Sequence, residues 1–181
     1  MLKNIEGLKL IPTKTFSDSR GYFRESYRRD IFRDILGRDL EFVQDNESLS
    51  AAGVLRGLHF QRPPHAQAKL VRVLRGAIYD VAVDLRPNSP TFKQWAAFEL
   101  NADDGSQLFV PEGLAHGFCA LTEGAVVSYK VSDFYAPECE GGVRWDDPEL
   151  AIPWPCSGAS AIVSAKDAVL PLLSELNPIG W

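Results

Sequence analysis

The segment GAIYDVAVDL, residues 76–85, alternates with a period of two, and this pattern limits the fold more than any other feature of the chain. Side chains alternate between the two faces of a strand, so the pattern predicts a β-strand. The preceding Arg75-Gly76 predicts a tight turn from another strand over residues 69–74. One face of the predicted strand carries Tyr79, Val81, Val83 and Leu85, and the other carries Ile78, Asp80, Ala82 and Asp84.

Strand patterns dominate the rest of the chain, and helix patterns are few. Helical spacing is found over residues 28–39, where Gly37 predicts the end of the helix, and a second short helix is expected within residues 168–176. This balance predicts a mainly β fold, an antiparallel β-barrel or jelly roll with a few short peripheral helices. Such a barrel can hold a ligand in its lumen. Further strands are predicted over residues 41–49, 95–100, 106–113, 116–121 and 125–135.

Length and charge restrict the class of protein. The 181 residues suffice for one domain with a hydrophobic core, and we find no internal repeat or linker. The net charge is −5, whereas a nucleic-acid-binding domain normally has a basic face, so no nucleic-acid partner is predicted. An anionic ligand would therefore need a local group of arginines and lysines.

The cysteines and the apolar segments bear on location. The three cysteines, Cys119, Cys139 and Cys156, are odd in number, and their spacings fit neither a disulfide framework nor a CxxC metal site. We therefore expect a reducing, cytoplasmic environment. The N-terminus lacks the apolar run of a signal peptide. No segment approaches the ~20 apolar residues of a membrane span, so no membrane partner is predicted.

Residues 53–73 place polar side chains in a segment that otherwise has the character of strands. A solvated outer face would explain them, but the apolar residues beside them indicate burial on at least one side. Strict alternation would send Arg56 and His59 to opposite faces, whereas a bulge at Gly57 would bring both to one site. The polar side chains in question are Arg56, His59, Gln61 and Lys69.

The three histidines of the chain do not suggest a metal centre. Metal sites of the cupin type usually contain two histidines one residue apart, and no H-x-H occurs in this sequence. His65 follows His59 by six positions, with two prolines between them, so a shared ion is not predicted. A structural role is the leading interpretation of His65 and an alternative for His116.

Three other groups each have a structural and a functional interpretation. Tyr129 could pack in the core, or could donate a proton at the lumen. Arg20 and Glu25 could belong to an exposed hairpin. Asp167 could stand at a helix entry capped by Ser164, or could support a histidine from elsewhere in the fold. The residues alone leave these alternatives open.

Eight segments, taken in order from about residue 17 to residue 167, closely resemble the dTDP-4-dehydrorhamnose 3,5-epimerases of the rhamnose pathway. The resemblance implies a cupin-like jelly roll with its core at roughly residues 40–155 of one domain, 1–181. It also implies a homodimer that exchanges N-terminal strands, a dTDP-linked 4-keto-6-deoxyhexose as substrate, and no metal or organic cofactor. The segments are SDSRGYFRESY, FVQDNESLSAAGVLRGLHFQ, AQAKLVRVLRGAIYDVAVDLR, SPTFKQW, QLFVPEGLAHGF, YKVSDFYAPE, GGVRWDDPELAIPWP and SAKD.

The same resemblance assigns roles to individual positions. His59 matches the family's general base, Asp167 its paired acid, and Tyr129 the residue that returns a proton. Lys69 matches the contact to the keto oxygen of the sugar, and Tyr135 the residue that stacks on thymine. The remaining matches to ligand contacts, some of which reach the partner's site, are Arg20, Glu25, Gln44, Asp45, Asn46, Arg56, His116, Glu140 and Lys166.

Three functions follow from this pattern. The first is epimerisation of dTDP-4-dehydro-6-deoxy-D-glucose at C3 and C5, which gives dTDP-4-dehydro-L-rhamnose. The second is epimerisation at one of these carbons, or on a related nucleotide sugar. The third is a non-catalytic cupin-like module that only binds sugars. A binding module does not need a base and an acid together, so the residues favour an enzyme.

Overall fold

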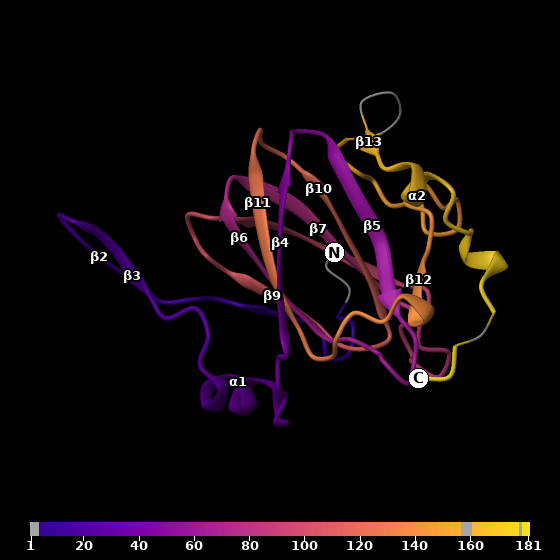
Figure 1. Ribbon diagram of the computed structural model, residues 1–181, viewed down its shortest axis with the longest axis horizontal. Helices are drawn as coiled ribbons and strands as arrows, with labels where there is room; N and C mark the ends of the chain where they lie inside the picture. Colours follow the sequence, from indigo (N-terminus) through magenta and orange to yellow (C-terminus); the bar gives the residue numbers. More distant parts are fainter. Residues whose placement is uncertain (1–3, 157–160, 178) are drawn as a thin grey trace.

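Two antiparallel sheets form the body of the protein in a computed structural model that describes residues 4–156, 161–177 and 179–181 (Figure 1). The first sheet contains, in spatial order, β1 (Lys9–Ile11), β9 (Gln107–Val110), β6 (Lys69–Arg75), β11 (Ala125–Val131) and β4 (Gln44–Ser50). The second contains β12 (Glu140–Gly142), β5 (Val54–Gln61), β10 (Leu114–Ala120), β7 (Ala77–Asp84) and β8 (Trp95–Asn101). The mainly β jelly roll predicted from the sequence is confirmed.

The sheets extend beyond the range of roughly 40–155 that was expected for the jelly-roll core. At the N-terminal end, β1 pairs with β9 at the edge of the first sheet. At the C-terminal end, β13 (Ile162–Val163) runs parallel to β5 and brings the following residues to the second sheet. Segments from both ends of the chain therefore complete the fold.

The second sheet is buried on both faces. Ile78 and Ala82 of β7 face the first sheet and join the core between the sheets. Val81 and Val83 face the opposite way and pack in a second core, which the C-terminal part of the chain covers with residues such as Trp154. The alternation predicted for residues 76–85 is confirmed, and both of its faces are enclosed.

Glycines end elements where the backbone must turn sharply. Gly76 has φ +76° between β6 and β7, and a Cβ there would lie 2.1 Å from the Thr122 hydroxyl oxygen. The turn predicted at Arg75-Gly76 is present, but it carries the chain from the first sheet to the second instead of closing a hairpin. Gly37 has φ +70° and ends α1 (Arg29–Leu36), as predicted.

The C-terminal helices differ from the prediction. The structure contains α2 (Ala165–Ala168), with Ser164 at its N-cap, and a 3₁₀ helix, η3 (Leu173–Glu175). A short helix was predicted within 168–176, and η3 lies in that range as a single 3₁₀ turn that begins after Pro171. The other short element, η1 (Pro137–Cys139), precedes β12. No helix in the described parts of the chain is long and apolar enough to cross a bilayer.

The hairpin of β2 (Thr15–Asp18) and β3 (Gly21–Arg24) projects away from both sheets (Figure 1). Its aromatic side chains are largely exposed: Phe16 by 51%, Tyr22 by 65% and Phe23 by 68%. More than half of each of these side chains is exposed in the single chain, and such exposed apolar surface is typical of a contact surface.

The cysteine prediction needs a correction. Cys119 of β10 and Cys156 form a disulfide across 37 residues of sequence, with 6.6 Å between their Cα atoms, while Cys139 is buried and unpaired. The spacing did not reveal this pair because the covering C-terminal segment brings Cys156 back over β10. The cysteine count therefore no longer supports the expected cytoplasmic location.

Candidate active site

A bulge in β5 brings Arg56 and His59 to one side of the sheet. His59 pairs with His116 of β10, but the next pair is Arg56 with Phe118, so three steps along β5 match two along β10. Gly57 sits at the bulge with φ +121°, and a Cβ there would lie 2.6 Å from the Gly117 Cα. The bulge predicted at Gly57 is confirmed, and Arg56 and His59 line the same cavity.

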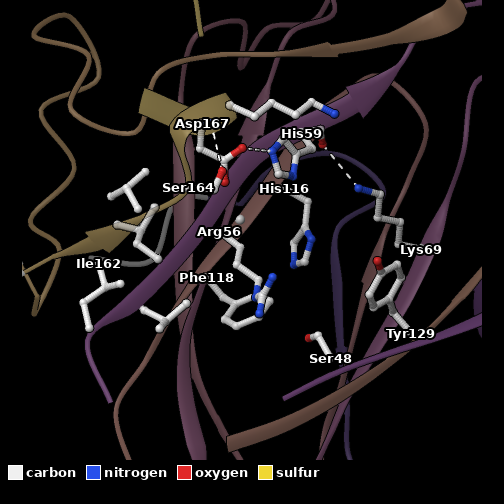
Figure 2. Close-up of a pocket in the computed structure, with 15 residues that line it drawn as sticks. Ser48, Arg56, His59, Lys69, His116, Phe118, Tyr129, Ile162, Ser164 and Asp167 are labelled. Atoms are coloured by element: carbon white, nitrogen blue, oxygen red, sulfur yellow. Dashed lines mark hydrogen bonds and ion pairs between the residues drawn. The ribbon is translucent and has the colours of Figure 1, made fainter. Parts of the chain in front are cut away.

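His59 forms a close pair with a carboxylate from α2. Its Nε2 lies 2.6 Å from Oδ1 of Asp167 (Figure 2). The backbone N–H of Gly57 donates to Oδ2 of the same carboxylate at 3.2 Å. Burial alone would raise the pKa of Asp167, but hydrogen bonds from His59 and Gly57 outweigh it and the pKa is lowered. With an anionic carboxylate at Nε2, the neutral ring holds its proton there and leaves Nδ1 to accept another.

Lys69 reaches the same space from the first sheet. Its Nζ donates to the backbone carbonyl of His59 at 3.3 Å. Burial of the ammonium group lowers its pKa to about 8, and the charges of Asp80 and Glu140 offset only part of that effect. A poorly solvated ammonium interacts strongly with any negative charge that develops beside it.

Tyr129 lies on the wall opposite β5. It occupies β11, pairs with Asn46 of β4, and borders the core between the sheets. Burial raises the pKa of its phenol, and the charge of Arg56 offsets part of this. The phenol therefore keeps its proton at neutral pH and is able to donate it. Both interpretations of Tyr129 made from the sequence fit its place between core and cavity.

These side chains converge on a cavity of about 470 Å³ between the two sheets (Figure 2). A neighbouring space of about 260 Å³ shares His59, Lys69 and Tyr129 with it, so the three residues stand where the two spaces meet. A volume of this order accommodates a small organic ligand. The wall from the second sheet carries the imidazole, and the wall from the first carries the ammonium and the phenol.

Polar side chains surround the outer part of the smaller space. The Tyr135 hydroxyl donates to Oε2 of Glu140 at 2.8 Å, and Nζ of Lys166 donates to the same oxygen at 2.6 Å. Burial would raise the pKa of Glu140, but these bonds outweigh it and lower the pKa. The Tyr135 backbone N–H donates to Oε1 of Gln44 at 3.1 Å. Tyr135 itself is 53% exposed, which leaves its ring available to stack on a planar group.

A second histidine–carboxylate pair lines the cavity. Nε2 of His116 lies 2.9 and 3.0 Å from the two carboxylate oxygens of Asp80, which is fully buried on β7. His116 both borders the cavity and has a structural partner, so the two interpretations made from the sequence are compatible. The alternation of residues 76–85 predicted the face on which Asp80 lies, but the sequence did not indicate its pairing with His116.

Four predicted or weighed residues lie elsewhere. Asp45 faces away from the cavity and pairs with Lys130 at 2.9 Å, because alternate residues of β4 point to opposite sides. We therefore remove Asp45 from the predicted contacts within this cavity. Arg20, beside the tip of the projecting hairpin, bonds to Asp18, and Glu25, just after that hairpin, lies 3.7 Å from Arg28. His65 bonds to Asp133 at 3.1 Å, in keeping with a structural role.

Several residues of the cavity were not found from the sequence. Ser48, Phe118, Ile162 and Val163 line the larger space, and Gln67 lines the smaller one. Strand alternation from Asn46 would have identified Ser48. The segment over residues 161–163 carries no sequence signal for its return to β5.

The fold and the cavity together define the class: a jelly-roll protein with an imidazole–carboxylate pair, an ammonium and a phenol around one cavity. In the parts of the chain that the structure describes, no three His, Cys, Asp or Glu side chains gather as a metal site. Acid–base chemistry on a bound small molecule is what these groups support directly.

Residues 3–175 match the family model described as dTDP-4-dehydrorhamnose 3,5-epimerase. The dTDP-4-dehydrorhamnose 3,5-epimerase of Salmonella typhimurium is 48% identical over 171 residues, which cover 94% of this chain and 93% of the relative. The chain belongs to the dTDP-4-dehydrorhamnose 3,5-epimerase family.

Solved structures of similar proteins agree with this. The dTDP-6-deoxy-D-glucose-3,5-epimerase of Legionella pneumophila, in complex with dTDP-4-keto-L-rhamnose, has a TM-score of 0.92 and 44% identity, covering 98% of this chain and 93% of that one. ChmJ, a 3'-monoepimerase from Streptomyces bikiniensis in complex with dTDP-quinovose, has a TM-score of 0.89 and 36% identity, covering 96% of this chain and 87% of that one.

Proposed function

We infer that the protein epimerises dTDP-4-dehydro-6-deoxy-D-glucose at C3 and C5 and so forms dTDP-4-dehydro-L-rhamnose. The observation that carries this inference is the convergence of His59, Lys69 and Tyr129 from two facing sheets, and of Asp167 from α2, on one cavity. Membership of the epimerase family supplies the substrate class and the double reaction. A cytoplasmic location stays a prediction.

The chemistry needs a base, a stabiliser of negative charge and an acid. Nδ1 of His59 removes the proton from C3 or C5, and the electrons of that C–H bond move to the C4 oxygen to give an enolate. The ammonium of Lys69 stabilises this oxyanion. Tyr129 then gives its proton to the same carbon from the opposite face, while the C4 carbonyl reforms. Solvent afterwards reprotonates the phenolate of Tyr129 and takes the proton from His59.

The position of each group supports its role. Asp167 accepts the other ring N–H of His59, so it fixes the tautomer and stabilises the imidazolium that forms. C3 and C5 both adjoin the C4 ketone, so one base serves both carbons if the sugar ring changes its pose. Tyr135 presents its ring to the thymine base from the smaller space, and Arg56 presents its guanidinium to the hexose in the larger cavity.

Incubation with dTDP-4-dehydro-6-deoxy-D-glucose in D₂O tests this function. We expect NMR to detect deuterium at both C3 and C5, because each epimerisation replaces a carbon-bound proton with a deuteron from solvent. Similarity to a 3'-monoepimerase makes reaction at C3 alone the second candidate, and label at that carbon only would select it. Binding without any label would select a non-catalytic module.

The same measurement separates the acid from the base. In Tyr129→Phe, His59 still removes the proton and returns a deuteron to the same face. We therefore expect the rate of epimerisation to fall more than the rate of deuterium exchange at C3 and C5. The affinity for substrate should change much less than the rate of epimerisation. A loss of affinity alone would make Tyr129 a binding residue.

We propose that two copies of the chain form a dimer through the projecting hairpin, β2–β3. The exposed aromatic side chains of this hairpin need an apolar partner surface, and a second copy supplies one. Arg20 and Glu25 would then enter the partner's site, which accounts for their distance from the cavity of their own chain. The site would be incomplete in an isolated chain.

Mixing two inactive variants tests this arrangement. Arg20→Ala and His59→Ala should each have low activity as homodimers, provided that Arg20 acts in the partner's site. In a heterodimer, one site has both intact residues and the other has neither. Co-expression of equal amounts should therefore restore about a quarter of the wild-type active sites. No recovery in heterodimers isolated with two different tags would contradict the exchange.

A further inference from the structure

The inward face of β4 carries four polar side chains in a row: Gln44, Asn46, Ser48 and Ser50. Gln44 donates to Oδ1 of Asn46 at 2.9 Å, and Oγ of Ser50 accepts from Nε of Arg56 at 3.1 Å. Ser48 differs from its neighbours. Among the residues that the structure describes, its Oγ is the one buried side-chain polar atom without a hydrogen-bond partner in the protein. A buried hydroxyl without a partner destabilises a fold, so this one stands out.

The position of Ser48 points to a ligand as the partner. Ser48 lines the larger cavity together with Arg56, His59 and Tyr129. Along β4 it lies between Ser50, which holds Arg56, and Asn46, which pairs with Tyr129. Figure 2 shows its hydroxyl in the space between Arg56 and Tyr129.

We propose that Ser48 is a substrate-positioning residue whose hydroxyl bonds an oxygen of the hexose in the larger cavity. This rests on the proposed function, in which Tyr129 faces the reacting carbons and Tyr135 holds the thymine on the side of the smaller space. The diphosphate then lies towards Tyr135, and the hexose extends past Tyr129 towards Ser48 and Arg56. A hexose presents hydroxyl oxygens there, and a serine hydroxyl bonds them because it donates and accepts.

Calorimetric titration of Ser48→Ala with dTDP and with dTDP-α-D-glucose tests the proposal. The second ligand keeps the hexose but lacks the C4 ketone, so it binds without reacting. We expect its Kd to rise about 3- to 10-fold, the usual effect of one lost hydrogen bond. The Kd for dTDP should stay unchanged, and an equal rise for dTDP would identify a phosphate oxygen and overturn the assignment to the hexose.

Ser128→Ala is the matched control. Ser128 lies on β11 next to Tyr129 but points to the opposite side of the sheet, so the same chemical change should leave both Kd values unaltered. Equal Kd values for Ser48→Ala and the wild type with both ligands would overturn the proposal.

Thermal stability separates positioning from a structural role. Ligand-free Ser48→Ala should have a Tm equal to or above that of the wild type, because the substitution removes an unpartnered buried hydroxyl. A Tm lower by several degrees would indicate a structural role and would also overturn the proposal. If the wild type itself neither bound dTDP-α-D-glucose nor epimerised the ketosugar, the proposed function would fail. An active wild type that Ser48→Ala matches would refute only the role of Ser48.

Discussion

Replacing His59 with alanine is expected to lower kcat by about 10²- to 10⁴-fold, the range that a general base contributes. The base sits on the bulge of β5 and has Asp167 at its Nε2. The larger cavity has one other histidine–carboxylate pair, in which the buried Asp80 bonds to Nε2 of His116. The kcat from steady-state kinetics and the rate of deuterium exchange at C3 and C5 should both fall in this variant.

Binding should survive this substitution. The nucleotide half of the substrate is held by other groups in the proposal, such as Tyr135, so the Kd for dTDP should change by no more than about 3-fold. His65→Ala is the matched control, because His65 bonds to Asp133 away from the cavity and its loss should leave kcat unaltered. Turnover at the wild-type rate in His59→Ala would remove His59 as the base.

Replacing Lys69 with methionine is expected to lower kcat by about 10²- to 10³-fold, because an oxyanion-stabilising donor contributes rate on that scale. Methionine keeps the length of the side chain but has no charge. Lys130→Met is the control: Lys130 lies on the opposite face of the first sheet and pairs with Asp45. An equal loss of activity in both variants would point to a general effect on the sheet instead of a local one.

The lowered pKa of Lys69 gives this variant a signature in pH. Lys69 carries its charge below a pH of about 8 and loses it above that value. The wild-type rate should therefore fall as pH rises through about 8. The residual rate of Lys69→Met should not show this fall with rising pH. A wild-type rate that stayed flat to pH 10 would mean that the charge of Lys69 is not used.

Stability should change in the opposite direction. Folding lowers the pKa of Lys69 from its usual 10.5, so the folded state disfavours the charged form. Between about pH 8 and 10.5 the unfolded chain binds more protons, and the free energy of unfolding therefore rises with pH. Lys69→Met removes the buried charge and should have a higher Tm at pH 7, and its advantage should shrink towards pH 10. A constant difference in Tm would contradict this.

Local sequence rules predicted the parts of the fold that depend on local sterics. The alternation of residues 76–85, the end of α1 at Gly37 and the bulge at Gly57 all follow from the conformations that single residues permit. Local rules could not predict the pairing of His59 with Asp167, because these residues are 108 positions apart in the sequence. Only the family resemblance indicated this pair.

The errors arose where distant segments meet. The turn at Arg75-Gly76 was recognised, but whether it closes a hairpin or crosses between sheets depends on which strands pair elsewhere. The Cys119–Cys156 disulfide was missed for the same reason, because only the fold brings the C-terminal segment over β10. Asp45 was assigned with its neighbours by resemblance, and strand alternation turns it away from the cavity of its own chain, so its contact with a ligand stays a prediction.

The C-terminal segment that covers the second sheet also carries Asp167 to His59. One piece of chain thus shields apolar surface and completes an ionisable pair. Substitutions that disturb its packing, for example at Trp154 or Leu173, would therefore lower the catalytic rate as well as the thermal stability. In a collection of random variants, thermal tolerance and turnover should therefore decline together along this stretch, and selection for either property would preserve both.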